Sequence, residues 1–176
     1  DSMIYWSKID SIYAIGNIKF VHGSKRGMMG DEMTIQYADS LVETIRIYNN
    51  AFAYNNLNSQ IIENGPYLFF RDEMASKNMI AYFDKKYISR LELFTMANSS
   101  YHVIDDNLIA GNNTTSSDSI FINFKEGNIK RLQAKGAAIG EFNPENNNTK
   151  IDTTIYYGAE YIDYHIDDQL TFLSHN

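Results

Sequence analysis

Residue types that can carry out catalysis or bind a metal are few in this sequence, and their spacing does not form a known site. No two of the four histidines are three to five residues apart, and the chain has no cysteine, so a zinc site has little support. These histidines are His22, His102, His165 and His175. Adjacent carboxylates occur at Asp31-Glu32, Asp105-Asp106 and Asp167-Asp168, but neighbours in a strand point to opposite faces and so make poor acid–base pairs. We therefore expect no catalytic residue, no metal site and no cofactor.

One enzymatic alternative stays open, because two carboxylates that face each other across a cleft can hydrolyse a glycosidic bond. The chain contains neither the Gly-x-Ser-x-Gly motif of serine hydrolases nor a phosphate-binding P-loop. Asp31 and Asp118 each precede an apolar segment, where aspartate commonly accepts hydrogen bonds from nearby backbone N–H groups. We predict a structural role for both, and we interpret His165 beside Asp167-Asp168 as polar residues at the end of a strand.

Composition points to an all-β protein that does not bind nucleic acid. The net charge is −7 and the pI is about 5.0, whereas nucleic-acid phosphates require a basic surface. Aromatic residues make up 14% of the chain, and Tyr and Phe pack well on the pleated surface of a sheet. Asp1 is not a natural start, so we expect a mature form or an excised segment of a longer protein, folded as a single domain over residues 1–176.

Three segments of the chain repeat one another without gaps. They align on Met33, Met79 and Ile120, which are spaced by 46 residues (33 to 79) and then 41 (79 to 120), and a weaker copy begins near Ile162. Each segment carries an aromatic residue four positions later, an aliphatic residue twelve later and alanine eighteen later. These matching positions are Tyr37, Phe83 and Phe124, then Ile45, Leu91 and Leu132, then Ala51, Ala97 and Ala138.

Each repeat reads as a β-hairpin. Residues 33–37 and 44–48 alternate apolar with polar side chains, and a polar turn separates them. Turns rather than helical crossovers join the strands, so we predict antiparallel pairing. A helix over residues 40–48 is an alternative, because Leu41, Ile45 and Tyr48 also have helical spacing. A chain of a dozen or more such strands could form a β-sandwich, a β-helix-like roll or an open jelly roll.

The repeated motif resembles the OstA-like lipopolysaccharide-transport family, which includes the periplasmic LptA proteins and the periplasmic N-terminal domain of LptD. The motif is Gly30-Asp31-Glu32-Met33, continuing through Ala51, and the segment Ala14–Phe20 looks like the family's Ala-x-Gly-x-Val strand. Ser116–Ile120 is similar to the variant Ser-Gly-Asp-x-Ile, with Ser117 in place of glycine. Lys77-Asn78-Met79 departs further and lacks the aspartate. The resemblance covers most of the chain, from about residue 12 to residue 173.

The resemblance implies an elongated, twisted, open β-jelly roll, shaped like a taco and built from repeated antiparallel hairpins of about 41–46 residues. It also implies a periplasmic, non-enzymatic module of a Gram-negative bacterium whose apolar groove carries the acyl chains of lipid A toward the outer membrane. Its partners would be lipopolysaccharide and other modules of the same kind, joined by edge-strand addition. It could be a free-standing bridge, or a domain tethered to the outer membrane ahead of a barrel.

Apolar residues in phase with the repeats are the candidates for the groove lining. They are Met33, Ile35, Tyr37, Ile45, Ile47, Met79, Ala81, Phe83, Leu91, Leu93, Ile120, Ile122 and Phe124. A packed core has the same binary pattern as a lipid-binding groove, so the pattern alone leaves both readings open. A glycan- or protein-binding β module on a cell surface is the rival function, and a hydrolase on a β-helix or jelly-roll scaffold is the third.

Overall fold

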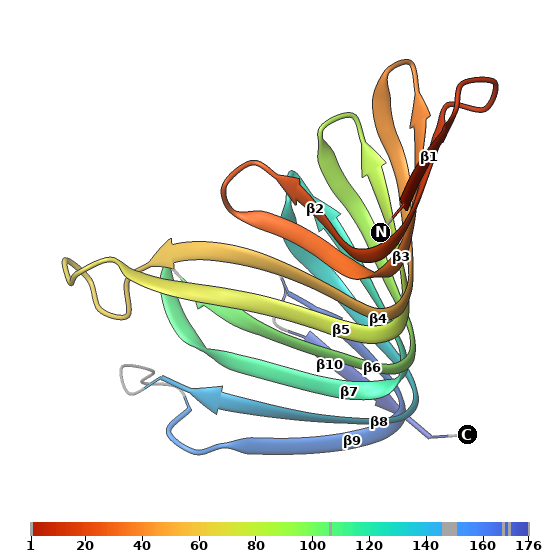
Figure 1. Cartoon of the computed structure of the whole chain (residues 1–176). Coiled ribbons are helices and arrows are strands. Elements are labelled where there is room, and N and C mark those ends of the chain that lie inside the picture. Colours follow the sequence, from red (N-terminus) through yellow and green to blue (C-terminus); the bar gives the residue numbers. More distant parts are fainter. Residues whose placement is uncertain (1, 106, 146–150, 167, 169, 176) are drawn as a thin grey trace.

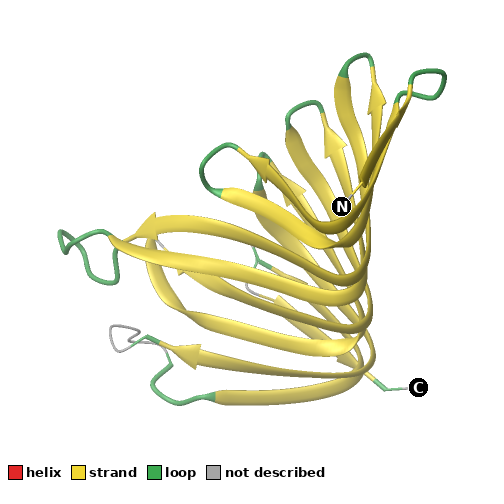
Figure 2. Cartoon of the chain, viewed as in Figure 1, coloured by secondary structure: helices red, strands yellow, loops and turns green. Residues whose placement is uncertain are grey.

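The computed structural model describes residues 2–105, 107–145, 151–166, 168 and 170–175, and it places ten strands in one antiparallel sheet (Figures 1 and 2). The strands are β1 (Ser2–Trp6), β2 (Ser11–His22), β3 (Arg26–Ala38), β4 (Leu41–Ser59), β5 (Leu68–Asp84), β6 (Tyr87–Asp105), β7 (Leu108–Lys125), β8 (Asn128–Pro144), β9 (Ile155–His165) and β10 (Leu170–Ser174). They lie in sequence order, and β1 and β10 form the two open edges. Within the described residues there is no helix, and therefore none long and apolar enough to cross a membrane. The predicted open, all-β fold is confirmed.

Every long strand bends near its middle, where the pairing register shifts. In the pair β2–β3 the shift lies between Ile15 and Ile18 of β2. Each later pair of strands, as far as β8–β9, has a shift at the corresponding level of the sheet. A β-bulge inserts extra residues into one strand and increases its local bend. The bulges therefore form a continuous line, along which the sheet folds over on itself (Figure 1).

This line divides the sheet into two arms. The first arm comprises β1, residues 11–15, 32–48, 78–94, 119–135 and 161–166, and β10. The second arm comprises residues 18–30, 51–75, 97–105, 107–116, 138–145 and 151–159. The inner faces of the two arms meet, because the rings of Phe20 on the second arm and Phe83 on the first lie 6.5 Å apart. The rings of Tyr101 and Tyr164 make the same kind of contact, also at 6.5 Å.

The sequence repeat corresponds to this bend. Asn49-Asn50, Thr95-Met96 and Gly136-Ala137 all have positive φ and occupy the same place in three successive repeats. In each case two residues oppose a single residue of the following strand, which is the definition of a bulge. Ser76 and Ser117, also one repeat apart, donate equivalent hydrogen bonds to the carbonyl oxygens of Asn78 and Ser119.

Tight turns at the tips of the first arm confirm the predicted hairpins. Asp39-Ser40 and Glu126-Gly127 have positive φ at both central positions, as two-residue hairpin turns require. The helical alternative for residues 40–48 is wrong, because Leu41 begins strand β4 and alternate residues of that segment face the core. The strand is favoured because Ile45 and Ile47 each pair with an apolar residue on both neighbouring strands.

The core of the first arm consists of two parallel rows of side chains that run across the sheet. Paired residues form each row, and the members from β3 to β8 are mostly less than 2% exposed. One row contains Ala14, Met33, Ile47, Met79, Leu93, Ile120, Ala134 and Ile162; the other contains Ile12, Ile35, Ile45, Ala81, Leu91, Ile122, Leu132 and Tyr164. Truncating one buried Leu, Ile or Met to Ala typically costs about 2–5 kcal/mol, so these rows dominate the stability of the sheet.

The bulge at Thr95-Met96 carries backbone strain that the preceding repeat avoids. A β-branched residue with positive φ is unusual, whereas asparagine tolerates this conformation and occupies both equivalent positions at Asn49-Asn50. Thr95 and Met96 are exposed, so replacing them removes no packing. We expect Thr95→Asn with Met96→Asn to raise the free energy of unfolding in urea by about 1 kcal/mol.

Thr34→Asn is the matched control, because Thr34 lies in a regular part of β3, paired on both sides and without positive φ. Asparagine is a poor strand residue, so this variant should be no more stable than the wild type. A loss of stability in the Thr95→Asn, Met96→Asn variant would show that the bulge is not strained.

Candidate functional site

The thirteen residues predicted to line a groove follow the alternation that places them on the inner face. Nine of them are at most 1% exposed and belong to the closed core of the first arm. These nine are Met33, Ile45, Ile47, Met79, Ala81, Leu91, Leu93, Ile120 and Ile122. Ile35, Tyr37, Phe83 and Phe124 are half-buried nearer the hairpin tips. Contact of any of them with lipid remains a prediction.

A cavity of about 430 Å³ lies between the inner faces of the two arms, within the size range of ordinary ligand sites. Of the predicted lining residues, Phe83, Leu91 and Phe124 border it, and the other ten do not. Its remaining apolar wall includes Phe20, Met28, Met74, Ile88, Val103 and Ile129. The second arm supplies more than half of this wall, and its residues lie outside the aligned core of the repeats.

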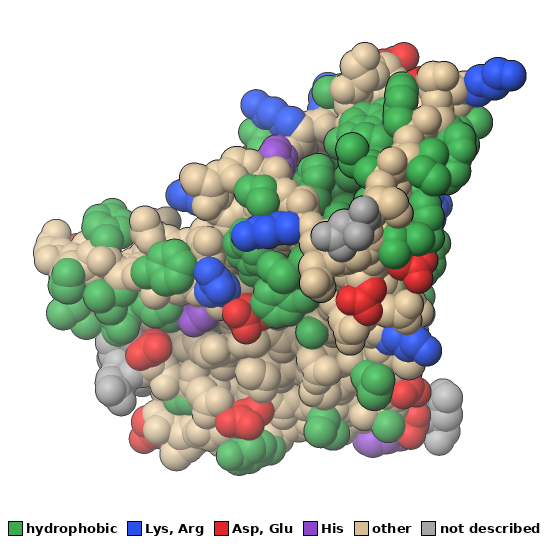
Figure 3. Space-filling model, viewed as in Figure 1, with side chains coloured by type: hydrophobic (Ala, Val, Ile, Leu, Met, Phe, Trp, Pro, Cys, Tyr) green, Lys and Arg blue, Asp and Glu red, His purple; other side chains and the backbone are tan. Residues whose placement is uncertain are grey.

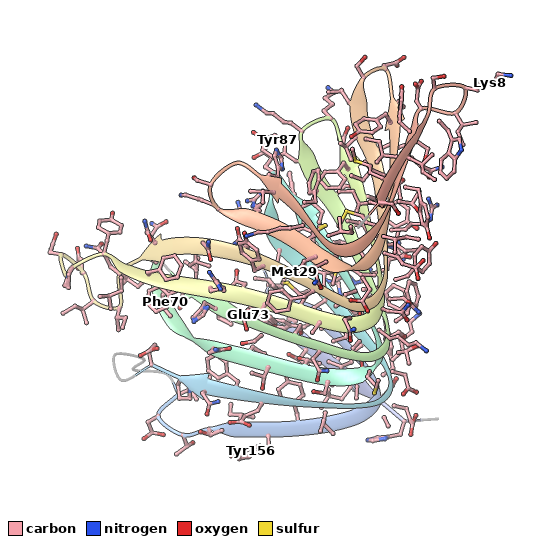
Figure 4. The ribbon with its side chains drawn as sticks, in the orientation of Figure 1. Lys8, Met29, Phe70, Glu73, Tyr87 and Tyr156 are labelled. Carbon is pink, nitrogen blue, oxygen red and sulfur yellow. The ribbon has the colours of Figure 1, made fainter. Side chains whose placement is uncertain are left out.

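One wall of the cavity is polar and centres on Asp72, which is 6% exposed. The Asp72 carboxylate accepts a hydrogen bond from the backbone N–H of His102 at 3.0 Å and one from the Asn55 side chain at 3.2 Å. The Nδ1 atom of His102 lies 3.1 Å from the same carboxylate, and the Phe70 ring packs 4.9 Å from the imidazole. Figure 4 shows Phe70 and Glu73 along this stretch of β5.

This polar group holds two strands together where their backbone pairing ends. The register of β5 with β6 runs to the pair Glu73 and Ser100, and beyond it the Asp72 carboxylate accepts from the His102 backbone in place of a carbonyl. Sequence reasoning missed Asp72. The sequence does contain a signal for it. Asp72 is an acidic residue two positions before Met74, at a place where the alternation of the strand calls for an apolar side chain.

Asp72 and His102 form a pair that could orient a proton transfer, but the cavity offers no matching nucleophile. Among the described residues that line it, hydroxyl groups come from Tyr54 and Tyr101 only. Burial raises the pKa of Tyr101 well above its ordinary value, which makes its ionised form unfavourable. The described residues also contain no cluster of three or more metal-binding side chains. The hydrogen bond from the His102 backbone to the Asp72 carboxylate gives the pair a structural role in joining β5 and β6.

A second polar cluster lies on the outer face of β8 and β9, around Asp163. Arg131 donates to both carboxylate oxygens, at 2.7 and 2.5 Å, and the Tyr161 hydroxyl donates at 3.2 Å. The Nε2 atom of His165 lies 3.4 Å from the same carboxylate. His165 thus contacts Asp163 near the end of β9; of the pair Asp167-Asp168, Asp167 lies outside the described residues.

The other sequence candidates are dispersed. Asp31 accepts a hydrogen bond from the Asn50 side chain at 2.7 Å, across the bend, and so has the structural role that its position predicts. Its partner is a side chain and not a backbone N–H. Asp118 lies against Gly136 at the equivalent bend two repeats further along the chain. Asp106 lies outside the described residues, so the pair Asp105-Asp106 has no structural description.

A scan against models of protein families finds no match for the chain, and a search of curated proteins finds none either. The resemblance to the OstA-like family therefore rests on the motif and on the geometry of the sheet.

The Asp163 cluster predicts a specific dependence of stability on pH. Hydrogen bonds from Arg131 lower the pKa of Asp163 below its ordinary value of about 3.9. The resulting stabilisation is complete above that value and is lost as the pH falls through the lower pKa of the folded state. We expect the coupling free energy between Arg131 and Asp163, from a double-mutant cycle with Arg131→Met and Asp163→Asn, to be about 1 kcal/mol at pH 7.

The same cycle, measured by urea unfolding at a pH low enough to protonate Asp163 in the folded state, should give a much smaller coupling. A coupling that is unchanged between the two pH values would contradict the assignment of the ion pair.

Proposed function

We propose that this protein is a periplasmic lipopolysaccharide-binding and transport module, in which acyl chains pass through the cavity between the two arms. The observation that carries the proposal is an open sheet folded over an apolar interior, with a cavity between its arms. Such a wall binds chains without specific contacts, because each buried CH₂ group contributes about 0.8 kcal/mol. In this proposal the energy for transport is supplied elsewhere, and the module provides the path.

The arms are offset in a way that favours stacking of such modules. Phe20 on β2 meets Phe83 on β5, and Tyr101 on β6 meets Tyr164 on β9, so in both contacts a second-arm strand faces a first-arm strand three positions later. The first arm of β1 and the second arm of β9 then lack such a partner within the described chain. Met3 on β1 is 73% exposed and Ile155 on β9 is 42% exposed, as that offset requires.

Both edge strands are apolar as well as open. β1 exposes Ile4, Tyr5 and Trp6, and β10 exposes Phe172 and Leu173. Figure 3 shows hydrophobic side chains gathered at the β1 end of the molecule. Unprotected apolar edges normally cause aggregation, whereas a protein that assembles by strand addition uses them as binding surfaces. These edges support the proposed partners, which are modules of the same kind and, at the outer membrane, a barrel.

Site-specific photocrosslinking tests the lipid path. A photoreactive amino acid at Phe83 or Phe124, which border the cavity, should crosslink to lipopolysaccharide. The same amino acid at Ile139 or Tyr156, which are 63% and 74% exposed on the outer face, should not (Figure 4). Circular dichroism of each variant checks that the sheet is intact.

The rival functions give different results in the same set of proteins. A glycan-binding module should bind soluble oligosaccharide and give no lipid crosslink from Phe83 or Phe124. A hydrolase should turn over a substrate and lose that turnover in a single carboxylate variant. Lipid crosslinks of equal yield from the cavity and from Ile139 would contradict the proposed path.

Sedimentation velocity tests association through the edges. The wild type should form oligomers whose size increases with concentration, and Ile4→Lys with Trp6→Lys should shift it toward the monomer, since charge on an edge strand opposes further pairing. Ile139→Lys is the matched control, because Ile139 is equally exposed but lies on β8, which is paired on both sides. A wild type that stays monomeric at all concentrations would contradict assembly through strand addition.

A further inference from the structure

Arg26 connects the two arms at the end of the cavity. Its Nε donates to Oδ1 of Asn55 at 3.0 Å, and its Nη2 donates to the carbonyl oxygen of Gly127 at 3.2 Å. Arg26 begins β3 on the second arm, whereas Gly127 lies in the turn between β7 and β8 on the first arm. All three residues border the cavity. The guanidinium group therefore lies where the hairpin tips of the two arms approach each other.

The turn at Gly127 is shaped to receive this side chain. Gly127 has φ of +82°, and a Cβ atom there would lie 2.6 Å from Nη2 of Arg26, which is closer than real contacts allow. Any other residue would be strained by the backbone and would displace the guanidinium. Asn55 fixes the other side of the same group, so Arg26 has a defined position at the cavity.

The charge around the cavity differs in sign from that of the whole protein. The chain carries −7 overall, but the ionised residues that border the cavity are Arg26, Lys130 and Asp72, with His22 and His102 beside them. The Asp72 carboxylate already accepts hydrogen bonds from the His102 backbone and the Asn55 side chain. The formal charges of Arg26, Lys130 and Asp72 sum to +1, which favours an anionic group on whatever the cavity binds.

On the first arm, Arg26 donates to a neutral carbonyl oxygen. An oxyanion is a stronger acceptor and competes well with this carbonyl for the guanidinium group. Hydrogen bonds between a guanidinium and a carboxylate or phosphate are about twice as strong as bonds to neutral acceptors, and the planar fork matches both oxyanions. A guanidinium has five N–H donors, of which two make the described contacts with Asn55 and Gly127.

We propose that Arg26 binds the carboxylate or phosphate of an acyl-chain ligand and is the residue that makes the cavity prefer acidic amphiphiles over neutral ones. The chain of the ligand lies along the apolar wall, and the oxyanion replaces the Gly127 carbonyl as acceptor. This inference rests on the proposed function, because it assigns the head-group chemistry of the ligand that the apolar wall accepts.

The test compares amphiphiles that share one chain and differ in the head group. Dodecanoate, dodecyl phosphate and dodecanol are titrated into the full chain by isothermal calorimetry. The wild type should bind at least one of the two anions about tenfold more tightly than dodecanol, which corresponds to about 1.4 kcal/mol. Preference for dodecyl phosphate alone or dodecanoate alone identifies a phosphorylated lipid or a free fatty acid as the natural source of the oxyanion.

Arg26→Gln should bind dodecanol as the wild type does and lose the preference for the anions. Arg46→Gln is the matched control: Arg46 is also half-buried and also bonded to a side-chain amide, that of Gln36, but it lies on the outer face of the first arm. This variant should keep the preference.

The outcomes separate the inference from the function on which it rests. Equal wild-type affinity for dodecanol and both anions would overturn the role of Arg26 and leave the lipid cavity standing, and this comparison requires no variant. A preference that survives Arg26→Gln would overturn it as well. Failure of the wild type to bind any of the three amphiphiles would instead count against lipid binding itself.

Discussion

The mid-strand bulge is the feature on which the rest of this structure depends. A flat sheet of strands this long would expose one apolar face to water, because no second sheet or helix in the described residues covers it. Two residues with positive φ opposite a single residue, repeated at Asn49-Asn50, Thr95-Met96 and Gly136-Ala137, bend every strand at the same level. The sheet then buries its own inner face, and the apolar rows acquire the opposing arm as their cover.

The two arms have different chemistry, and this difference places the cavity. On the first arm the rows of Ile, Leu, Met and Ala pack closely, and the side chains around Leu93 and Ile120 are at most 1% exposed. On the second arm the inner face carries polar residues such as Asn55, Asp72 and Asn113, which interdigitate less tightly with an apolar wall. A cavity forms where the polar stretch of the second arm faces the wider hairpin tips of the first, near Phe83 and Phe124.

Much of the first arm could be predicted from the sequence, because its information is local. Alternation, turn residues and the spacing of Met33, Met79 and Ile120 specify strands, register and the buried face together. The cavity could not be predicted in the same way. Phe20 meets Phe83, and Arg26 meets Gly127 across 101 residues, only because the bend and the twist offset the arms by several strands. That offset results from the bends of all the strands together, so the sequence of a single repeat does not reveal it.

The same offset explains why the fold is incomplete at both ends. A closed barrel would pair its first and last strands, and a sandwich would cover each arm along its whole length. Here the ring contacts between the arms join strands three positions apart, and exposed inner-face residues remain at both ends, Met3 on β1 and Ile155 on β9. In the proposed assembly by edge-strand addition, the exposed inner face at β9 of one copy would cover the exposed inner face at the β1 end of the next. A continuous lining through such a stack would then use the same geometry that builds the single cavity.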